Sequence, residues 1–154
     1  MCNLKNLSIF SLIFGLIAGF LALIPVLGVI IFLMIVFCSS FIILIFLKKT
    51  NNLICPDEKS GLLYGGITGF IAYIGFILIF LPLSFILSLI FKESYFTGIG
   101  MIIKSGFSLM LMLILFIGIL CAMMNSFSGL ASIYFFNTEN KNKKFSLEMN
   151  KENK

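Results

Sequence analysis

Apolar residues occur along this chain in long runs that are separated by short polar segments. The first run has no Lys, Arg, Asp or Glu between Leu7 and Leu47. A bilayer core is crossed by about 20 helical residues, so this run is long enough for two membrane spans. We expect the chain to reverse at Pro25 to Gly28, because Pro interrupts helical hydrogen bonding and Gly accepts the positive φ of a tight turn.

The second half of the chain contains two more apolar runs. One begins at Gly61 and continues to Leu81, and the apolar pattern resumes after Pro82 as far as residue 91. This extension is either a kinked prolongation of the span, which we prefer, or a helix in the membrane interface. The last run, 106–136, would be about 46 Å long as a helix, whereas a bilayer core is about 30 Å thick. We therefore expect this span to tilt, protrude or break.

The pattern as a whole predicts an all-α fold. We expect an integral membrane four-helix bundle, built from two helical hairpins within residues 1–137. Residues 138–154 are rich in Lys and Asn and poor in apolar side chains, which predicts a disordered cytoplasmic tail. The predicted spans are 7–24, 29–47, 61–81 with the extension to 91 left open, and 106–136.

Small residues at four-residue spacing predict the faces on which these helices pack. Gly61, Gly65 and Gly69 lie on one face of the third span, where the absence of side chains lets a second helix approach closely. The fourth span carries a small, weakly polar stripe that suits the glycine faces of the first and third spans. The predicted helix-packing residues are Ser11, Gly15, Gly19, Gly61, Gly65, Gly69, Gly118, Ala122, Asn125, Ser126 and Gly129.

The first and third spans also resemble each other. Residues 14–24 align with residues 64–74 at six of eleven positions, and the alignment pairs Gly15 with Gly65 and Gly19 with Gly69. This predicts a parallel internal repeat of a two-helix unit. The alternative is chance agreement between two membrane helices that are both rich in Gly, Ile and Phe.

Composition and charge strengthen the membrane interpretation. Apolar residues make up 60% of the chain and charged residues 11%, and the mean hydropathy is +1.16, which exceeds what a soluble core requires. The net charge of +5 comes from eleven lysines, which lie beside the apolar runs and do not interleave with aromatic residues, so no nucleic-acid partner is predicted. Most of the lysines fall on the side that holds both termini. The positive-inside rule then predicts a multi-pass protein of the cell membrane with cytoplasmic N- and C-termini.

The spans lack the residues that membrane enzymes and ion-coupled transporters use. The chain has no His, no predicted span contains Asp or Glu, and the four cysteines form no CxxC motif. These absences argue against proton-coupled exporters, intramembrane aspartyl proteases and disulfide oxidoreductases. We predict no enzyme activity and no catalytic, cofactor or metal site.

Asn125 is the exception among the polar residues of the spans. Hydroxyls in membrane helices usually bond to their own backbone, whereas the amide of Asn125 needs a partner across the bundle or a water-filled cavity. Together with Ser126, Ser128 and Gly129, it is also the expected weak point of the long fourth span.

These features predict a small structural or accessory membrane protein that packs with itself or with a larger membrane complex. The first alternative is a pore or transporter for a neutral or apolar solute, formed between the two halves or between protomers. A lysis-type permeabiliser with a Lys-rich tail is a weaker alternative, because disrupting a bilayer does not require four closely packed spans.

Overall fold

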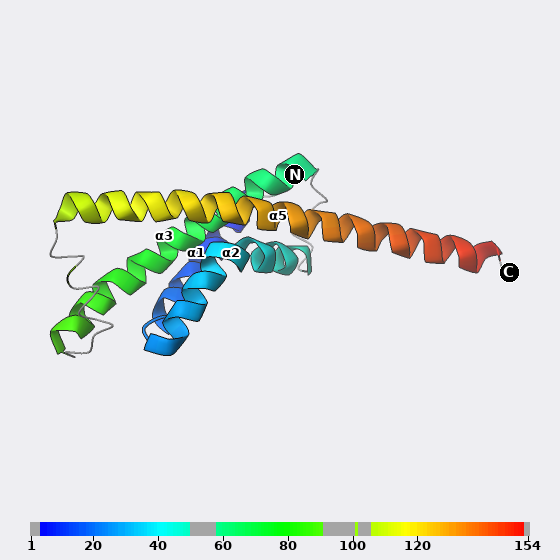
Figure 1. Cartoon of the computed structure of the whole chain (residues 1–154). Helices are drawn as coiled ribbons and strands as arrows, with labels where there is room; N and C mark the ends of the chain where they lie inside the picture. Colours follow the sequence, from blue (N-terminus) through cyan, green and yellow to red (C-terminus); the bar gives the residue numbers. More distant parts are fainter. Residues whose placement is uncertain (1–3, 50–57, 91–100, 102–105, 153–154) are drawn as a thin grey trace.

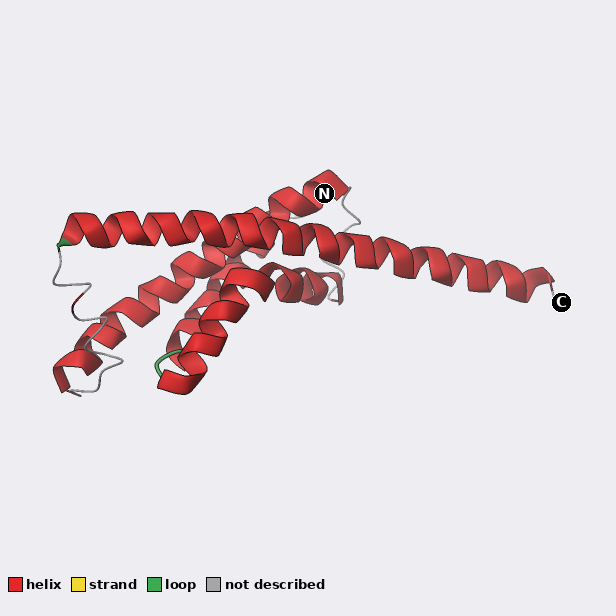
Figure 2. Ribbon diagram, in the orientation of Figure 1, coloured by secondary structure: helices red, strands yellow, loops and turns green. Residues whose placement is uncertain are grey.

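The computed structural model describes residues 4–49, 58–90, 101 and 106–152. Four long helices account for almost all of these residues (Figures 1 and 2). They are α1 (Leu4–Leu21), α2 (Pro25–Lys49), α3 (Glu58–Ile90) and α5 (Phe107–Glu152).

Each helix has a segment that is long and apolar enough to cross a membrane. These segments contain 18 residues in α1, 23 in α2, and 31 each in α3 and α5. The prediction of an all-α fold with four long apolar helices is therefore confirmed. Apolar positions lie all round these segments, which is typical of helices that are surrounded by other apolar groups.

The α1–α2 turn lies three residues earlier than the sequence predicts. Ala22, Leu23 and Ile24 form the turn, and Pro25 is the first residue of α2. Proline is favoured at this position because its missing N–H would have no helical partner there and its φ already suits a helix. Gly28 lies inside α2, where its N–H donates to the carbonyl of Ile24 over 2.7 Å. The predicted reversal at Pro25 to Gly28 is thus wrong, because the turn lies at residues 22–24.

Two further expectations concern helix ends. Helix α3 continues through Pro82 to Ile90, so the apolar stretch after the proline prolongs the third helix. Helix α5 continues to Glu152, whereas the sequence analysis predicts a disordered tail from residue 138. No Gly or Pro occurs after Gly129, and adding residues to an existing helix avoids the cost of nucleation. The polar end of α5 extends past the other helices (Figure 1).

The helices alternate in direction along the chain. Gly15 of α1 lies against Ala72 of α3, and Gly19 lies against Phe76, so α1 and α3 run parallel. Gly61 of α3 lies against Ile133 of α5 and Gly118 lies against Tyr73, so α3 and α5 run antiparallel. Figure 1 shows α5 running obliquely to α3 and to the part of α2 before its bend, while the part of α2 after the bend runs roughly parallel to α5. The arrangement is therefore more splayed than the predicted four-helix bundle.

The core consists of two clusters on either side of a bend in α2. Ile35, before the bend, packs with Ala18, Tyr73, Phe76 and other residues of α1, α3 and α5. Ile43, Leu44 and Leu47, after the bend, pack around Leu7 of α1. Figure 1 shows the bend near the middle of α2. Since α2 has no proline after Pro25, the bend needs another cause.

Candidate functional site

The predicted helix-packing glycines of α3 form a close seam with α5. A methyl group on Gly65 would meet the backbone oxygen of Asn125 and lie 2.9 Å from the Cα of Gly129. A methyl group on Gly69 would meet the side chain of Asn125. Both glycines are buried, so the two helix backbones approach as closely as small residues permit. The remaining α5 residues of the prediction lie along the same seam: Gly118 beside the rings of Phe70 and Tyr73, and Ala122 and Ser126 beside Gly66.

The glycines of α1 form a second seam, which lies on a different side of α3. A methyl group on Gly15 would meet the backbone oxygen of Ala72, and one on Gly19 would lie 2.6 Å from the backbone oxygen of Phe76. On the α3 side of this seam, a methyl group on Gly75 would lie 2.7 Å from the backbone oxygen of Leu12 in α1. Helix α3 therefore has one close contact with α1 and another with α5. The sequence analysis expects α5 to pack against the glycines of α1 as well, but those glycines contact α3.

This difference bears on the internal repeat, which remains a prediction. A two-fold axis that exchanges α1 and α3 would place Gly65 and Gly69 against α1, as Gly15 and Gly19 lie against α3. Instead, Gly65 and Gly69 contact α5. The paired glycines share a sequence pattern but contact different neighbours.

Asn125 lies against the bend of α2, which divides this helix into a first leg that contains Ile35 and a second leg that contains Ile43. Its side chain is fully buried, and its carboxamide makes five hydrogen bonds. Oδ1 accepts from the Ser39 hydroxyl at 2.9 Å and from the Ser40 N–H at 2.8 Å. The two Nδ2 hydrogens are shared among three carbonyls, those of Ile35 at 2.8 Å, Val36 at 2.9 Å and Cys121 of its own helix at 3.0 Å.

These contacts involve two backbone groups that a regular helix pairs with each other. In a regular helix the Ser40 N–H bonds to the Val36 carbonyl, and here Asn125 bonds to both of these groups. A side chain that enters the ladder in this way is a recognised cause of sharp helix bends, so we attribute the bend of α2 to Asn125. Helix α5, which Asn125 was expected to weaken, is continuous at this residue.

Other buried or half-buried hydroxyls bond mainly within their own helices, as expected from the sequence. Ser11 donates to Leu7 at 2.7 Å, Ser126 donates to Ala122 at 2.8 Å, and Thr68 donates to Tyr64 at 2.7 Å. Two buried hydroxyls, those of Ser40 and Ser84, have no hydrogen-bond partner among the described residues.

Sequence reasoning missed Ser39 and Ser40. They interrupt a run of bulky apolar residues in α2, yet both are fully buried and both bond to Asn125. Ser39 bonds through its hydroxyl, whereas Ser40 bonds through its backbone N–H. The signal was therefore the polar side chain of Ser39 within an apolar span. The partner of Asn125 across the bundle, which the sequence analysis leaves open, is thus the backbone and Ser39 of α2.

Within the described residues, no group of three or more His, Cys, Asp or Glu side chains could hold a metal ion. Besides hydroxyls, three tyrosines and two cysteines, the polar side chains of the four apolar segments are Asn6, Asn125 and Asn137. Lys5, near the start of α1, is the one charged residue within these segments. Among the polar side chains, Asn125 is the one that joins α5 to α2. A comparison with protein-family models, curated proteins and solved structures finds no match to this chain.

The α3–α5 seam predicts that even a methyl group at Gly65 destabilises the protein. Gly65→Ala would collide with backbone, which cannot move aside easily, and overpacking of this kind costs about 1–3 kcal/mol. Gly65→Leu combined with Gly69→Leu should sharply lower the folded yield in detergent. The matched control is Leu63→Ala, because Leu63 is 59% exposed and its truncation should change stability little. Equal stability of all these variants would show that the seam does not hold the helices together.

The Asn125 contacts predict a loss of stability and a change in the shape of α2. Asn125→Ala should lower the free energy of unfolding by about 1–2 kcal/mol, the range found for polar contacts between membrane helices. Without the amide, the Ser40 N–H and the Val36 carbonyl can bond to each other, so α2 should straighten. Spin labels at Val26 and Ile45, which are exposed, should then move further apart.

Ser126→Ala is the control for this measurement. Its hydroxyl bonds only to its own helix at Ala122, so its loss should leave the label distance unchanged. An unchanged distance in Asn125→Ala as well would show that the bend has another cause.

Proposed function

We propose that the four apolar helices cross a membrane and that this chain is a structural or accessory protein, which packs with itself or with a larger membrane complex. The observation that carries the proposal is the use of the Asn125 carboxamide, the most polar group of the buried core. All of its hydrogen bonds in the structure go to this chain's own helices. The amide therefore fastens helices and does not face a path for a solute.

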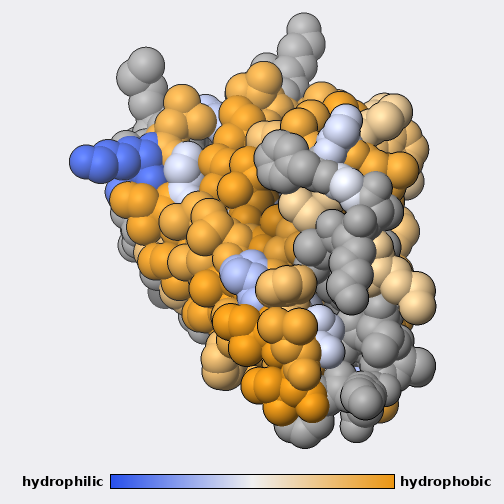
Figure 3. All heavy atoms as spheres, turned by 90° about the vertical axis from the view of Figure 1, so that its left-hand side faces the viewer, coloured by the Kyte–Doolittle hydropathy of each residue, from blue (hydrophilic) through white to orange (hydrophobic). Residues whose placement is uncertain are grey.

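The exposed surface supports insertion into a bilayer. Large apolar side chains cover it on all four helices, including Val26, Leu89, Met112 and Phe127, which are each at least 67% exposed. Figure 3 shows one face of the molecule on which apolar residues predominate among the described atoms. Soluble monomers rarely expose apolar patches beyond a few hundred Å². A bilayer supplies the apolar surroundings that such a surface requires.

The lengths of α3 and α5 are compatible with their oblique crossing. A helix of 31 residues is about 46 Å long, and at a tilt of about 40° it covers about 35 Å along the membrane normal. Two long spans can thus both cross the bilayer when they tilt in different directions. We place both termini in the cytoplasm, because Lys5 and most of the other lysines lie on that side.

A pore for a polar neutral solute requires polar groups along an opening between helices, whereas a path for an apolar solute does not. The grooves among the described helices are mainly apolar, which argues against the polar solute. One lies between α3 and α5 and is lined by apolar residues and glycine apart from Ser126. Another, between α2 and α5, has Tyr134 and Thr138 at its polar positions. These linings support a structural or accessory role, and we propose no enzyme activity.

The topology can be tested with reporter fusions. Fusions at Asn52 and after Lys154 should report the cytoplasm, and a fusion at Thr97 should report the opposite face. Any other combination would contradict four spans with both termini inside.

Liposomes that contain the purified protein test the structural role. We expect no leakage of a trapped dye and no flux of a small neutral solute, because no polar path crosses the described helices. Empty liposomes and liposomes with a known pore provide the two reference levels. Selective flux of the neutral solute would favour the transporter alternative, and dye leakage would favour the permeabiliser.

A further inference from the structure

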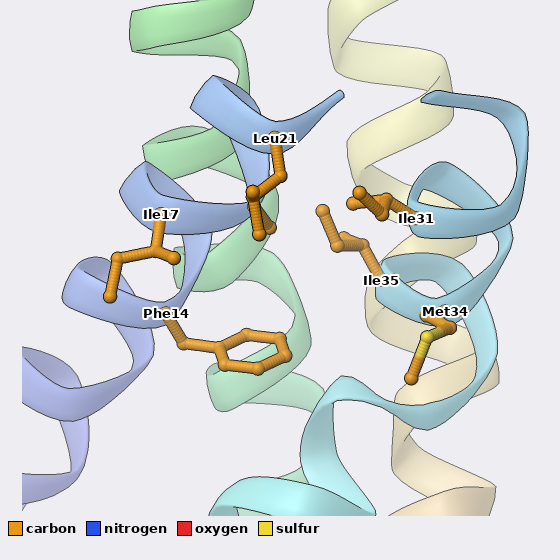
Figure 4. Close-up of a pocket in the computed structure, with 7 residues that line it drawn as sticks. Phe14, Ile17, Leu21, Ile31, Met34 and Ile35 are labelled. Carbon is orange, nitrogen blue, oxygen red and sulfur yellow. The ribbon is translucent and has the colours of Figure 1, made fainter. Parts of the chain in front are cut away.

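A small apolar cavity separates α1 from the first leg of α2. Its volume is about 200 Å³. Figure 4 shows Phe14, Ile17 and Leu21 on α1 and Ile31, Met34 and Ile35 on α2 around this space. Ala18, which is 6% exposed, completes the lining. No polar side chain is among these residues.

The α2 wall of the cavity is held in place from outside. Ile35 lines the cavity with a fully buried side chain, while its carbonyl accepts a hydrogen bond from Nδ2 of Asn125. The bend of α2 follows immediately. Because this hydrogen bond ties the backbone of α2 to α5 beside the cavity, a movement of this part of α2 toward α1 would strain it. The contact therefore favours an open cavity.

The opening of the cavity faces the surroundings of the molecule. Ile17, Leu21 and Met34 line it and are 57%, 47% and 43% exposed. Water does not occupy such a space stably, since a bound water needs two to four polar partners and apolar cavities remain dry. An empty space, in turn, deprives its lining of dispersion contacts.

We propose that this cavity binds a segment of a lipid acyl chain. The inference rests on the proposed insertion of the helices into a membrane, where acyl chains surround the opening. The size suits a short segment of such a chain, since an apolar cavity of about 150 Å³ accommodates a molecule such as benzene. A helix about 10 Å in diameter occupies about 400 Å³ per turn, so a membrane helix of a second copy does not fit.

A single tryptophan can test this proposal, because the chain has none of its own. Phe14→Trp places the reporter in the cavity wall, and the protein is reconstituted in phosphatidylcholine bilayers with brominated acyl chains, which quench tryptophan fluorescence. We expect strong quenching. Adding Ala18→Leu fills the cavity and should remove most of that quenching. Ala131→Leu is the matched control, because Ala131 lies on the exposed side of α5 and its enlargement should leave the quenching unchanged.

A second tryptophan reporter distinguishes a failure of the proposed membrane insertion from a failure of the proposed acyl-chain site. Phe116→Trp lies on an exposed surface of α5, 63% exposed, and should be quenched whenever the protein is in the bilayer. If Phe116→Trp escapes quenching, membrane insertion is wrong. If Phe116→Trp is quenched and Phe14→Trp is not, or if filling the cavity changes nothing, only the acyl-chain site is wrong.

A substitute variant and a dilution series complete the experiment. Should Ala18→Leu fail to fold, Met34→Phe fills the cavity from its exposed rim and should give the same loss of quenching. The measurement is also repeated at increasing lipid-to-protein ratios. Quenching of Phe14→Trp that appears only on dilution would show that a side chain of a second copy occupies the cavity, and would overturn the proposal.

Discussion

The structure depends on the need of buried polar groups for partners in apolar surroundings. A carboxamide without hydrogen bonds would be costly in the core, and Asn125 avoids this cost by bonding to the backbone of a neighbouring helix. The backbone groups of α2 near its bend face the same requirement. One side chain thus bonds to polar groups of both α2 and α5. The contact lies at the bend of α2, and the two core clusters lie on either side of it.

Close backbone contact is the second means by which the helices associate. The glycine faces of α3 let α1 and α5 approach it on different sides, so α3 is the central helix of the fold. In a bilayer, apolar side chains gain little by leaving lipid for one another, which makes such contacts and the Asn125 bonds the specific forces available. The large side chains outside the seams then provide an apolar exterior that does not compete with them.

Much of the fold could be predicted from the sequence because its signals are local. Four apolar runs gave four helices, and the spacing of Gly61, Gly65 and Gly69 predicted a packing face. The need of Asn125 for a partner was equally visible. Its particular partner was not, because the choice between the backbone of α2 and a water-filled cavity depends on tertiary contacts. The turn was predicted at Pro25 to Gly28, but it lies before Pro25. A proline between two apolar runs is compatible both with the end of one helix and with the first residue of the next, so the sequence does not distinguish the two. The helix over residues 138–152 was missed because the prediction of a disordered tail rested on composition alone. Composition does not show whether a segment continues a helix that has already formed.

The bend in α2 has a consequence for the order in which the protein assembles. Helix α2 precedes α5 in the chain, so during synthesis it is complete before Asn125 exists. At that stage its Ser40 N–H and Val36 carbonyl have only each other as regular helical partners. We therefore expect α2 to be straight in the newly made α1–α2 hairpin and to bend when α5 joins it. On this hypothesis the last helix changes the shape of a helix that was made before it.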